Sequence, residues 1–386
     1  MKILALLSDR PWPPITGSRV RNAHLWPELR RLGVDVRLLA LDQGGGPSAG
    51  DPIEVEPHPF VCEFLPLRAY HALRFSYHQW PVSRSLRRRA AELVATWRPD
   101  VVHAEELRMA AYLPRKQAGG STLRTMTLHN VESDLLRQTG STALRWGSAL
   151  IEAMHRESLA RFERRAVRAV DLALAYSARD LARYRELYPE GRWAATRNGY
   201  HAAAITPAPQ TSTPAVLLVG SLGYAPNVHG LYWFLDRVLP LLPSEITVTV
   251  AGSRAPDEVR RRLARSPVRF VDSPVDLAPL YAAHALSVVP VFQGSGTRGK
   301  ILESLAYERA VVTTTMGAAG LELAEGEGYV VGDDAEQFAA RAARLVSSPQ
   351  ERGALASRGR AAVLELYDWS RVAADMLAAW SACASR

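Results

Sequence analysis

The sequence is poor in lysine, in cysteine and in long apolar runs. Of its 47 Lys and Arg residues only three are lysines: Lys2, Lys116 and Lys300. The two cysteines, Cys62 and Cys383, are too few for a disulfide framework or a cysteine metal cluster, and they suit a reducing compartment. No apolar run approaches the roughly 20 residues that a membrane span needs, and the apolar run at the N-terminus is too short for a signal peptide. These shortages exclude a disulfide scaffold and argue against a membrane-spanning helix, and we expect a cytoplasmic protein.

The charge is distributed unevenly along the 386 residues. The formal net charge is +8, but residues 1–200 hold 30 basic and 21 acidic residues, whereas residues 201–386 hold 17 and 18. A GC-rich genome accounts for the excess of arginine over lysine. The asymmetry needs another reason, such as an acidic acceptor or peripheral contact of the N-terminal half with a membrane surface. We expect no nucleic-acid partner, because no recognition motif or basic strip interleaved with aromatics is present.

Short apolar runs alternate with amphipathic stretches, which is typical of βαβ units and parallel sheets. In the first half we expect strands at 3–8, 35–41, 101–104, 125–129 and 171–176 and helices at 18–31, 83–96 and 147–169. In the second half we expect strands at 215–219, 247–251, 268–271, 285–290 and 310–314. The chain should close with helices at 336–347, 350–367 and 372–383. The pattern predicts an α/β protein with two successive sheets.

A Pro- and Thr-rich segment, 205–214, interrupts the periodicity and is interpreted as a linker. We therefore expect an N-terminal domain at 1–205 and a C-terminal domain at 206–367, with a helix at about 368–386 packing back on the first. The expected architecture is two Rossmann-like domains facing across a cleft. In such sheets ligands bind outside the carboxyl ends of the strands, so the loops after strands are where chemistry is expected.

The most informative segment is a glycine-rich loop that follows a strand and leads into a helix near Thr297. Arg298 and Lys300 lie in the first helical turn, where the helix dipole disfavours cations and favours anions. Positive side chains at this position indicate an anionic partner such as a diphosphate. Glu303 shares a helix face with Lys300 and is placed to accept hydrogen bonds from ribose hydroxyls. The alternative is an ordinary glycine-rich turn with solvated charges.

This segment resembles the retaining family 4 (group 1 type) glycosyltransferases of the GT-B fold, in particular a bacterial subset with the pattern G-x-G-T-R-x-K-x-x-E. Further blocks of the chain match that subset in the same order. The matching blocks are 128–133, 220–227 with Trp233 and Phe234, 294–306, 310–312, 317–321 and 367–369. The resemblance thus covers essentially the whole chain.

The resemblance implies that the C-terminal domain binds a nucleotide diphosphate sugar and the N-terminal domain a hydroxyl acceptor. It implies catalytic roles for His129, Arg298 and Lys300, with His129 as a hydrogen-bond donor to the sugar or the leaving phosphate. The donor-binding residues that it implies are Gly17, Ser18, Ser221, Asn227, Ser295, Gly296, Thr297 and Glu303. Two positions depart from the family pattern. Ser295 stands where the first glutamate of its E-x7-E motif is usual, and Gly299 stands where relatives carry a large aliphatic residue.

Polar side chains also follow strands in the first half. Gly17 precedes a helix that Ser18 can cap, and the alternative there is a plain cap followed by solvated arginines. His129 ends a strand, where the sequence alone favours a hydrogen-bonded structural histidine, and only the resemblance favours a place near the donor sugar. Glu105, Glu106 and Glu132 are candidates for orienting the acceptor, the alternative being solvated loops. A zinc site is not expected, because the third ligand and its spacing are missing.

We therefore predict transfer of a sugar with retention at the anomeric carbon, without a metal ion or a further cofactor. Two alternatives share the architecture. A nucleotide-sugar 2-epimerase would form product from the donor alone, and a catalytically silent partner subunit would bind donor without turnover. A nicotinamide dehydrogenase is disfavoured, because no G-x-G-x-x-G follows the first strand.

Overall fold

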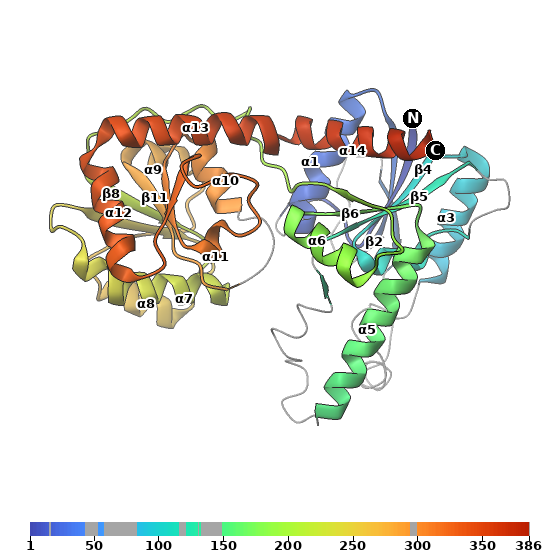
Figure 1. The fold of residues 1–386 in the computed structure, drawn as a ribbon, viewed down its shortest axis with the longest axis horizontal. Helices are drawn as coiled ribbons and strands as arrows, with labels where there is room; N and C mark the ends of the chain where they lie inside the picture. The colour runs from blue at the N-terminus through green and yellow to red at the C-terminus, as the bar shows by residue number, and fades with distance from the viewer. Residues whose placement is uncertain are drawn as a thin grey trace. The chain divides into compact units, whose positions relative to one another are not determined.

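The computed structural model describes residues 1–14, 17–42, 53–57, 83–115, 121–129, 131–132, 149–293 and 299–385, without the side chains of 149–156. It divides the chain into two compact units (Figure 1). Unit 1 is Met1–Asn198 with Val372–Arg386, and unit 2 is Gly199–Arg371. The chain thus passes from one unit to the other at Asn198–Gly199, whereas the sequence placed the boundary at 205–206.

Unit 1 is built on a parallel sheet. Its strands are β1 Lys2–Leu7, β2 Asp35–Asp42, β3 Ile53–Pro57, β4 Val101–Glu105, β5 Leu123–Leu128, β6 Leu172–Ala175 and β7 Trp193–Ala195. Their order across the sheet is β3-β2-β1-β4-β5-β6-β7, and every pair is parallel. Residues Ile3 to Leu7 of the inner strand β1 are wholly buried. This is typical of a strand whose two faces are both covered by helices.

The helices of unit 1 are α1 Gly17–Arg31, α3 Arg84–Trp97, α5 Ala149–Ala169, α6 Ala178–Leu187 and the larger part of α14 Trp369–Ala384. α3 begins where the Ser83 hydroxyl accepts a hydrogen bond from the amide of Leu86 at 3.3 Å. α14 brings the end of the chain back to unit 1, where Met376 and Trp380 are buried. α5 extends away from the sheet of its own unit (Figure 1).

Unit 2 repeats this plan with six strands. They are β8 Ala215–Val219, β9 Thr247–Gly252, β10 Arg269–Asp272, β11 Leu286–Val289, β12 Val311–Thr313 and β13 Tyr329–Val331. The order is β10-β9-β8-β11-β12-β13, again all parallel. The helices are α7 Ala225–Trp233, α8 Asp257–Ala264, α9 Ala278–Ala283, α10 Gly299–Ala306, α11 Thr315–Ala318, α12 Ala335–Ser347 and α13 Pro349–Tyr367. The apolar side chains of these strands and helices form the core of the unit.

The predicted α/β fold with two Rossmann-like units is confirmed. Each of the ten predicted strands has a counterpart whose ends agree within two residues. The strands that the sequence missed, β3, β7 and β13, lie at the edges of the sheets. An edge strand is short and has a partner on one side only, so it lacks the long apolar run that marks a central strand.

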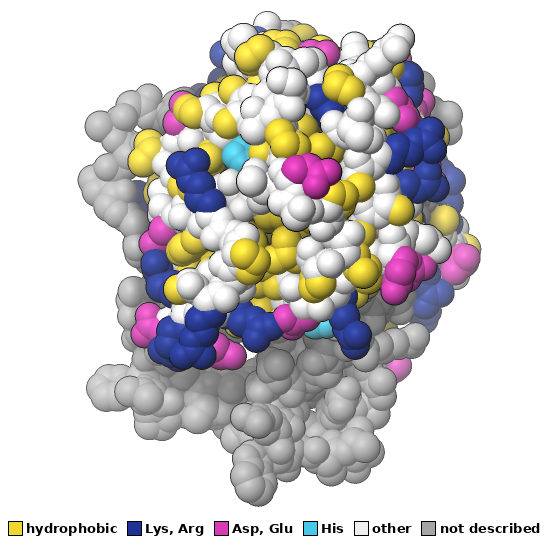
Figure 2. All heavy atoms as spheres, turned by 90° about the vertical axis from the view of Figure 1, so that its left-hand side faces the viewer, with side chains coloured by type: hydrophobic (Ala, Val, Ile, Leu, Met, Phe, Trp, Pro, Cys, Tyr) yellow, Lys and Arg dark blue, Asp and Glu magenta, His cyan; other side chains and the backbone are white. Residues whose placement is uncertain are grey.

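The surface of unit 2 carries mixed charge. On the face seen in Figure 2, basic, acidic and apolar side chains are interspersed, in keeping with the near balance of charge in residues 201–386. Among the described residues, no helix is long and apolar enough to cross a membrane.

The segment 205–214, expected to be a linker, is instead bonded to unit 2. Three arginine side chains, those of Arg309, Arg352 and Arg360, donate hydrogen bonds to its backbone carbonyls. The acceptors are the carbonyls of Ile205, Ala208, Pro209 and Thr211. Arg309 is 1% exposed, and burial together with nearby Arg352 lowers its pKa to about 10. The proline-rich segment 205–214, which its composition suggested to be a linker, is thus a strap that arginine side chains hold on unit 2.

Replacing Arg309 by methionine should destabilise unit 2, because the carbonyls of Tyr281 and Ala208, now bonded at 2.7 and 3.0 Å, would lose their donor. We expect a loss of about 2–4 kcal/mol in urea unfolding. The control is Arg344→Met, because Arg344 is exposed and pairs only at the surface with Glu351. That variant should change stability by less than about 0.5 kcal/mol. Equal urea midpoints for the two variants would contradict a stabilising strap.

Candidate active site

In each sheet the strand order reverses at one point, and the predicted site residues gather at these two points. The reversal lies between β1 and β4 in unit 1 and between β8 and β11 in unit 2. At such a point neighbouring connections run to opposite faces of the sheet, which leaves a crevice at the carboxyl ends of the strands. The two sites are described separately below.

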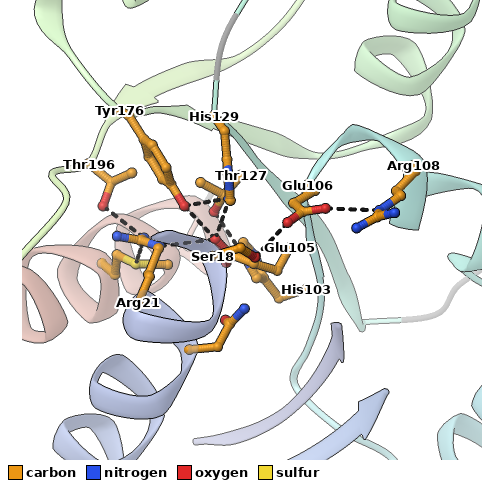
Figure 3. A network of polar contacts seen from close by, with 12 residues as sticks. Ser18, Arg21, His103, Glu105, Glu106, Arg108, Thr127, His129, Tyr176 and Thr196 are labelled. Carbon is orange, nitrogen blue, oxygen red and sulfur yellow. Dashed lines mark hydrogen bonds and ion pairs between the residues drawn. The ribbon is translucent and has the colours of Figure 1, made fainter. Parts of the chain in front are cut away.

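Glu105, the last residue of β4, is the centre of a buried polar network in unit 1 (Figure 3). Its Oε1 accepts hydrogen bonds from Arg21 Nε at 3.0 Å and from the Tyr176 hydroxyl at 2.7 Å. The Nε2 nitrogens of His129 and His103 lie 3.1 Å from Oε1 and Oε2 respectively. Glu105 is fully buried. The prediction that its carboxylate faces an acceptor is therefore wrong.

Arg21 compensates the buried charge of Glu105. Burial alone would raise the pKa of Glu105, but the guanidinium of Arg21 and the bonds from His103 and His129 outweigh it and hold that pKa well below its usual value. The arginine is 1% exposed and also donates to the backbone carbonyl of Arg197 at 2.6 Å. The alternative of solvated arginines after the first loop is therefore wrong for Arg21, which holds a structural ion pair.

His103 is a structural histidine in the interior of unit 1. It lies between Trp26 and Trp380, with ring centroids 5.8 and 5.4 Å away, and it is fully buried. Burial lowers its pKa, so the ring is neutral near pH 7. The ionised Glu105 can only accept, so the proton lies on Nε2, which is also 2.9 Å from the Thr127 hydroxyl, and Nδ1 accepts from the Thr125 hydroxyl at 2.8 Å.

His129 is the member of the network that reaches the surface. Its side chain is 19% exposed, and its ring stacks on Tyr176 with centroids 4.4 Å apart. Its Nε2 lies 2.5 Å from the Tyr176 hydroxyl and 3.1 Å from Glu105. Among the residues that the structure describes, no group bonds its Nδ1. One edge of the imidazole is thus held by Glu105 and Tyr176, and the other carries no hydrogen bond from a described residue.

Glu106 and Ser18 form a second polar pair beside this network. The Ser18 hydroxyl donates to Glu106 at 2.5 Å, and Arg108 donates to the other carboxylate oxygen at 2.9 Å. Ser18 therefore does not cap α1 as predicted, since that helix begins at the exposed Gly17 and Ser18 lies in its first turn. Burial would raise the pKa of Glu106, but nearby His129 and Arg108 outweigh it and lower that pKa.

The backbone at Glu106 is strained. Its φ is 79° and its ψ 151°, a region that side chains with a Cβ rarely occupy. The amide of Glu106 bonds to the carbonyl of Thr127 at 3.1 Å, which ties the strained residue to β5. Strain that is held in place next to an accessible histidine is typical of functional sites.

Glu132 lies beside a second buried glutamate, Glu163. The backbone amide of Glu132 donates to Glu163 at 3.1 Å, and the Tyr188 hydroxyl donates to the other oxygen of Glu163 at 2.8 Å. Burial and the charge of Glu163 raise the pKa of Glu132 to about 7. Glu132 is therefore a carboxyl group that can hold or release a proton near neutral pH.

In unit 2, Lys300 of α10 meets the loop after β8. Its amine donates to the side-chain oxygen of Asn227, whose amide nitrogen donates to the carbonyl of Ser221 at 2.8 Å. A Cβ at Gly220 would lie 3.0 Å from the Lys300 amine. Only a residue without a side chain lets the lysine approach the backbone this closely. Gly220 and Asn227, from one segment after β8, thus flank the amine of Lys300, which lies 73 residues beyond Asn227 in the chain.

Glu303 lies one helical turn after Lys300 and is held by two phenol groups. The Tyr281 hydroxyl donates to Oε1 at 2.8 Å and the Tyr200 hydroxyl to Oε2 at 3.1 Å. Burial raises the pKa of Glu303 in spite of these bonds and the charge of Lys300. Each carboxylate oxygen keeps a second lone pair for a further donor.

Three predicted donor-binding residues and the predicted catalytic Arg298 lie outside the described residues. These are Ser295, Gly296, Thr297 and Arg298. Their roles stay predictions. The adjoining Gly299 begins α10, and no atom of a described residue lies within 4 Å of the position that a Cβ would take there.

The sequence interpretation missed four residues that hold the site groups: Arg21 as an ion-pair partner, Tyr176, Tyr200 and Tyr281. Tyr176 directly follows β6, at the same carboxyl edge as Glu105, so its position after a strand was a usable signal. Tyr200 and Tyr281 follow no strand end and gave no comparable signal. Within the described part of the chain, no group of three or more His, Cys, Asp or Glu side chains is arranged to hold a metal ion.

Comparison with known families agrees with this architecture. Residues 16–199 match the family described as Glycosyl transferase 4-like domain, and residues 213–348 match the family described as Glycosyl transferases group 1. The chain belongs to the group 1 glycosyltransferases. This glycosyltransferase is 26% identical to glycogen synthase from Mycobacterium tuberculosis over 97% of its own length and 92% of that protein. A 44.6 kDa uncharacterized protein of the Klebsiella pneumoniae cps region is 29% identical over 135 residues, and the match spans 35% of that relative.

Solved structures of GT-B glycosyltransferases have the same fold. HepE from Anabaena in complex with UDP aligns with a TM-score of 0.69 at 16% identity, over 99% of this chain and 100% of that chain. Sucrose-phosphate synthase from Thermosynechococcus elongatus aligns with a TM-score of 0.68 at 15% identity, over 99% and 98%. These likenesses establish two Rossmann-like units of the GT-B type in this glycosyltransferase.

The raised pKa of Glu132 predicts a pH dependence of stability. The folded state keeps the proton up to about pH 7, whereas an unfolded glutamate releases it near pH 4.3. The stability that Glu132 contributes to the folded state is thus fully present below about pH 4.3 and is lost as the pH rises through 7. As the pH rises from 4.5 to 8, the free energy of unfolding of Glu132→Gln should increase by about 2–3 kcal/mol relative to that of the wild type.

Urea unfolding of the full chain at several pH values measures this difference. The matched control is Glu157→Gln, on α5, whose side chain is 64% exposed, and it should follow the wild type at every pH. If the free energy of unfolding depended on pH in the same way for wild type and Glu132→Gln, Glu132 would be ionised in the folded protein over the whole pH range tested.

Proposed function

We propose that this glycosyltransferase moves a sugar from a nucleotide diphosphate sugar to a hydroxyl acceptor, with retention at the anomeric carbon and without a metal ion. The observation that carries the proposal is the arrangement of Lys300, Asn227 and Gly220 at the strand reversal of unit 2, with Glu303 one turn further along α10. Positive charge and a carboxylate on one helix face match the two ends of a nucleoside diphosphate.

The cation at this point serves the leaving group. Negative charge grows on the diphosphate as the bond to the sugar breaks, and a fixed ammonium group stabilises that charge. The close approach of the Lys300 amine to Gly220 fixes its position before the substrate arrives. Arg298, two residues earlier, is proposed as the second cation at the start of the same helix.

Glu303 is proposed to bind the ribose. Its two oxygens already accept from Tyr281 and Tyr200, and this fixes the plane of the carboxylate. The remaining lone pairs accept from two adjacent ribose hydroxyls. Uridine nucleotides are the first donors to test, because HepE from Anabaena was solved in complexes with UDP and with UDP-glucose.

Unit 1 is proposed to contact the reacting hydroxyl groups. The ring of His129 is partly exposed, and the charge of Glu106 contributes to the raised pKa of Glu132. In a retaining transfer the departing phosphate takes the proton of the acceptor, so no strong protein base is required. Gly17 and Ser18 are proposed to border the donor phosphates at the start of α1.

The acceptor is proposed to be anionic or membrane-borne. A groove of about 460 Å³ on α5 is lined by Ser158, Arg161, Phe162 and Arg165, which combines cationic and apolar groups. Part of the positive charge near it is compensated, since Arg164 and Arg168 both approach Glu190. Phosphorylated and lipid-linked sugars are therefore the acceptors to test first.

Lys300→Ala should lower kcat about 100-fold or more, because one preorganised charge on the leaving group would be missing. The measurement is transfer or slow donor hydrolysis, with circular dichroism to verify the fold. Lys2→Ala is the control: Lys2 lies on β1 near Trp97 and should keep wild-type kinetics. An unchanged kcat in Lys300→Ala would refute the proposed phosphate site.

A matching nucleotide sugar should raise the melting temperature in EDTA, because ligand that binds only the folded state stabilises it. A panel of UDP and GDP sugars, with UMP as the control for the second phosphate, identifies the donor. The shift should disappear in Lys300→Ala. A shift that requires Mg²⁺ would overturn metal independence. Conversion of donor alone to a second nucleotide sugar would favour an epimerase, and donor binding without turnover would favour a silent subunit.

A further inference from the structure

We propose that Glu105 and Tyr176 are positioning residues that hold His129 as the tautomer protonated on Nε2, so that Nδ1 presents a lone pair to a substrate hydroxyl. The proposal rests on the proposed function for the identity of that hydroxyl, which belongs to the donor sugar or the acceptor. It assigns a task to the fully buried part of the network in Figure 3.

The first step is that Glu105 can only accept hydrogen bonds. The carboxylate lies 3.0 Å from the guanidinium of Arg21 and is wholly buried, so the arginine keeps it ionised. An ionised carboxylate has no proton to donate. Any histidine nitrogen that bonds to it must therefore carry a hydrogen.

The second step concerns Tyr176, whose hydroxyl has a single proton. That proton points to Glu105 Oε1, at 2.7 Å, and the phenol cannot also donate to His129. The Tyr176 oxygen, 2.5 Å from His129 Nε2, is thus an acceptor toward the ring. Burial also raises the pKa of Tyr176 far above its usual value, so the phenol keeps its proton.

The third step follows from the two acceptors around Nε2. A neutral imidazole has one proton, and here both neighbours of Nε2 require it at that nitrogen. Nδ1 is then unprotonated, and no described residue bonds to it. His129 therefore accepts a hydrogen bond from a hydroxyl in its neutral form and donates through Nδ1 only when it carries a second proton. This differs from the role of a donor that the sequence suggested.

Replacing Glu105 by glutamine changes this arrangement at one atom. The amide oxygen still faces Arg21 and Tyr176, but without the negative charge it holds a proton at Nε2 less strongly, so the Tyr176 proton can turn toward Nε2 in part of the molecules. The His129 proton then moves to Nδ1, where it blocks the lone pair. Tyr176→Phe removes one acceptor but leaves Glu105, so the Nε2-protonated form should persist.

Long-range ¹H–¹⁵N correlation spectra of the donor-free full chain, labelled at histidine, report the tautomer directly. His129→Gln identifies the resonance among the ten histidines. At a pH where the ring is neutral we expect the Nε2-protonated pattern in wild type and in Tyr176→Phe, and a gain of the Nδ1-protonated form in Glu105→Gln. An Nδ1-protonated ring in wild type or in Tyr176→Phe would overturn the proposal even if Glu105→Gln fails to fold.

Kinetics then test whether the tautomer matters for transfer. Glu105→Gln should lower kcat about tenfold or more in the wild-type background and cause no further loss in the His129→Gln background. Glu28→Gln is the control, since Glu28 is nearly buried in α1 but pairs with Arg31. If Glu105→Gln lowered kcat by the same factor in both backgrounds, the role of Glu105 would be structural only. The spectra require no substrate, so failure of the tautomer assignment is distinguishable from failure of the donor site, which Lys300→Ala tests.

Discussion

The ion pair between Arg21 and Glu105 is the constraint on which unit 1 depends. Arg21 joins α1 to the end of β4 and also donates to the carbonyl of Arg197 and contacts the sulfur of Met376 in α14 at 3.1 Å. One side chain therefore connects the first helix, a central strand and the returning end of the chain. Removing one member of such a buried pair costs about 3–5 kcal/mol, because the other charge is left uncompensated. The same pair keeps Glu105 ionised, and that fixes the hydrogen bonds of the histidines around it.

Each unit holds a glutamate near the strand reversal of its sheet, Glu105 at the end of β4 and Glu303 in α10, and the two carboxyl groups have opposite properties. In unit 1 the partner of Glu105 is a guanidinium, and the pKa of the carboxyl lies well below its usual value. In unit 2 the direct partners of Glu303 are two neutral phenols, and burial raises its pKa. A carboxylate fully paired with a cation is suited to holding a neighbouring side chain. One held by neutral donors, with lone pairs to spare, is suited to binding hydroxyl groups of a ligand.

The sequence predicted what depends on local pattern and missed what depends on distant contacts. Apolar runs located the central strands of both sheets. The positions of Glu105 and His129 at strand ends, and of Lys300 at the start of a helix, singled out these residues as candidates. The partners of these residues are far away in the chain: Arg21 is 84 residues from Glu105, Tyr176 is 71 residues from it, and Asn227 is 73 residues from Lys300. Spacing alone could not distinguish a Glu105 that faces a substrate from one that supports a histidine. That distinction required the fold.

The scarcity of lysine has a physical side beyond codon usage. Arg21, Arg309 and Arg352 are each 1% exposed and each bind several carbonyl or carboxylate oxygens. The planar guanidinium offers five donors in a fixed geometry for this, whereas an ammonium group offers three. The arginines at the surface of α5 are partly paired with acids, so the excess charge of residues 1–200 overstates the positive field that an acceptor meets. Where a compact cation is needed beside Gly220, the chain uses one of its three lysines. Recognition of the acceptor should therefore depend on a few local groups, among them His129 and Glu132, more than on net charge.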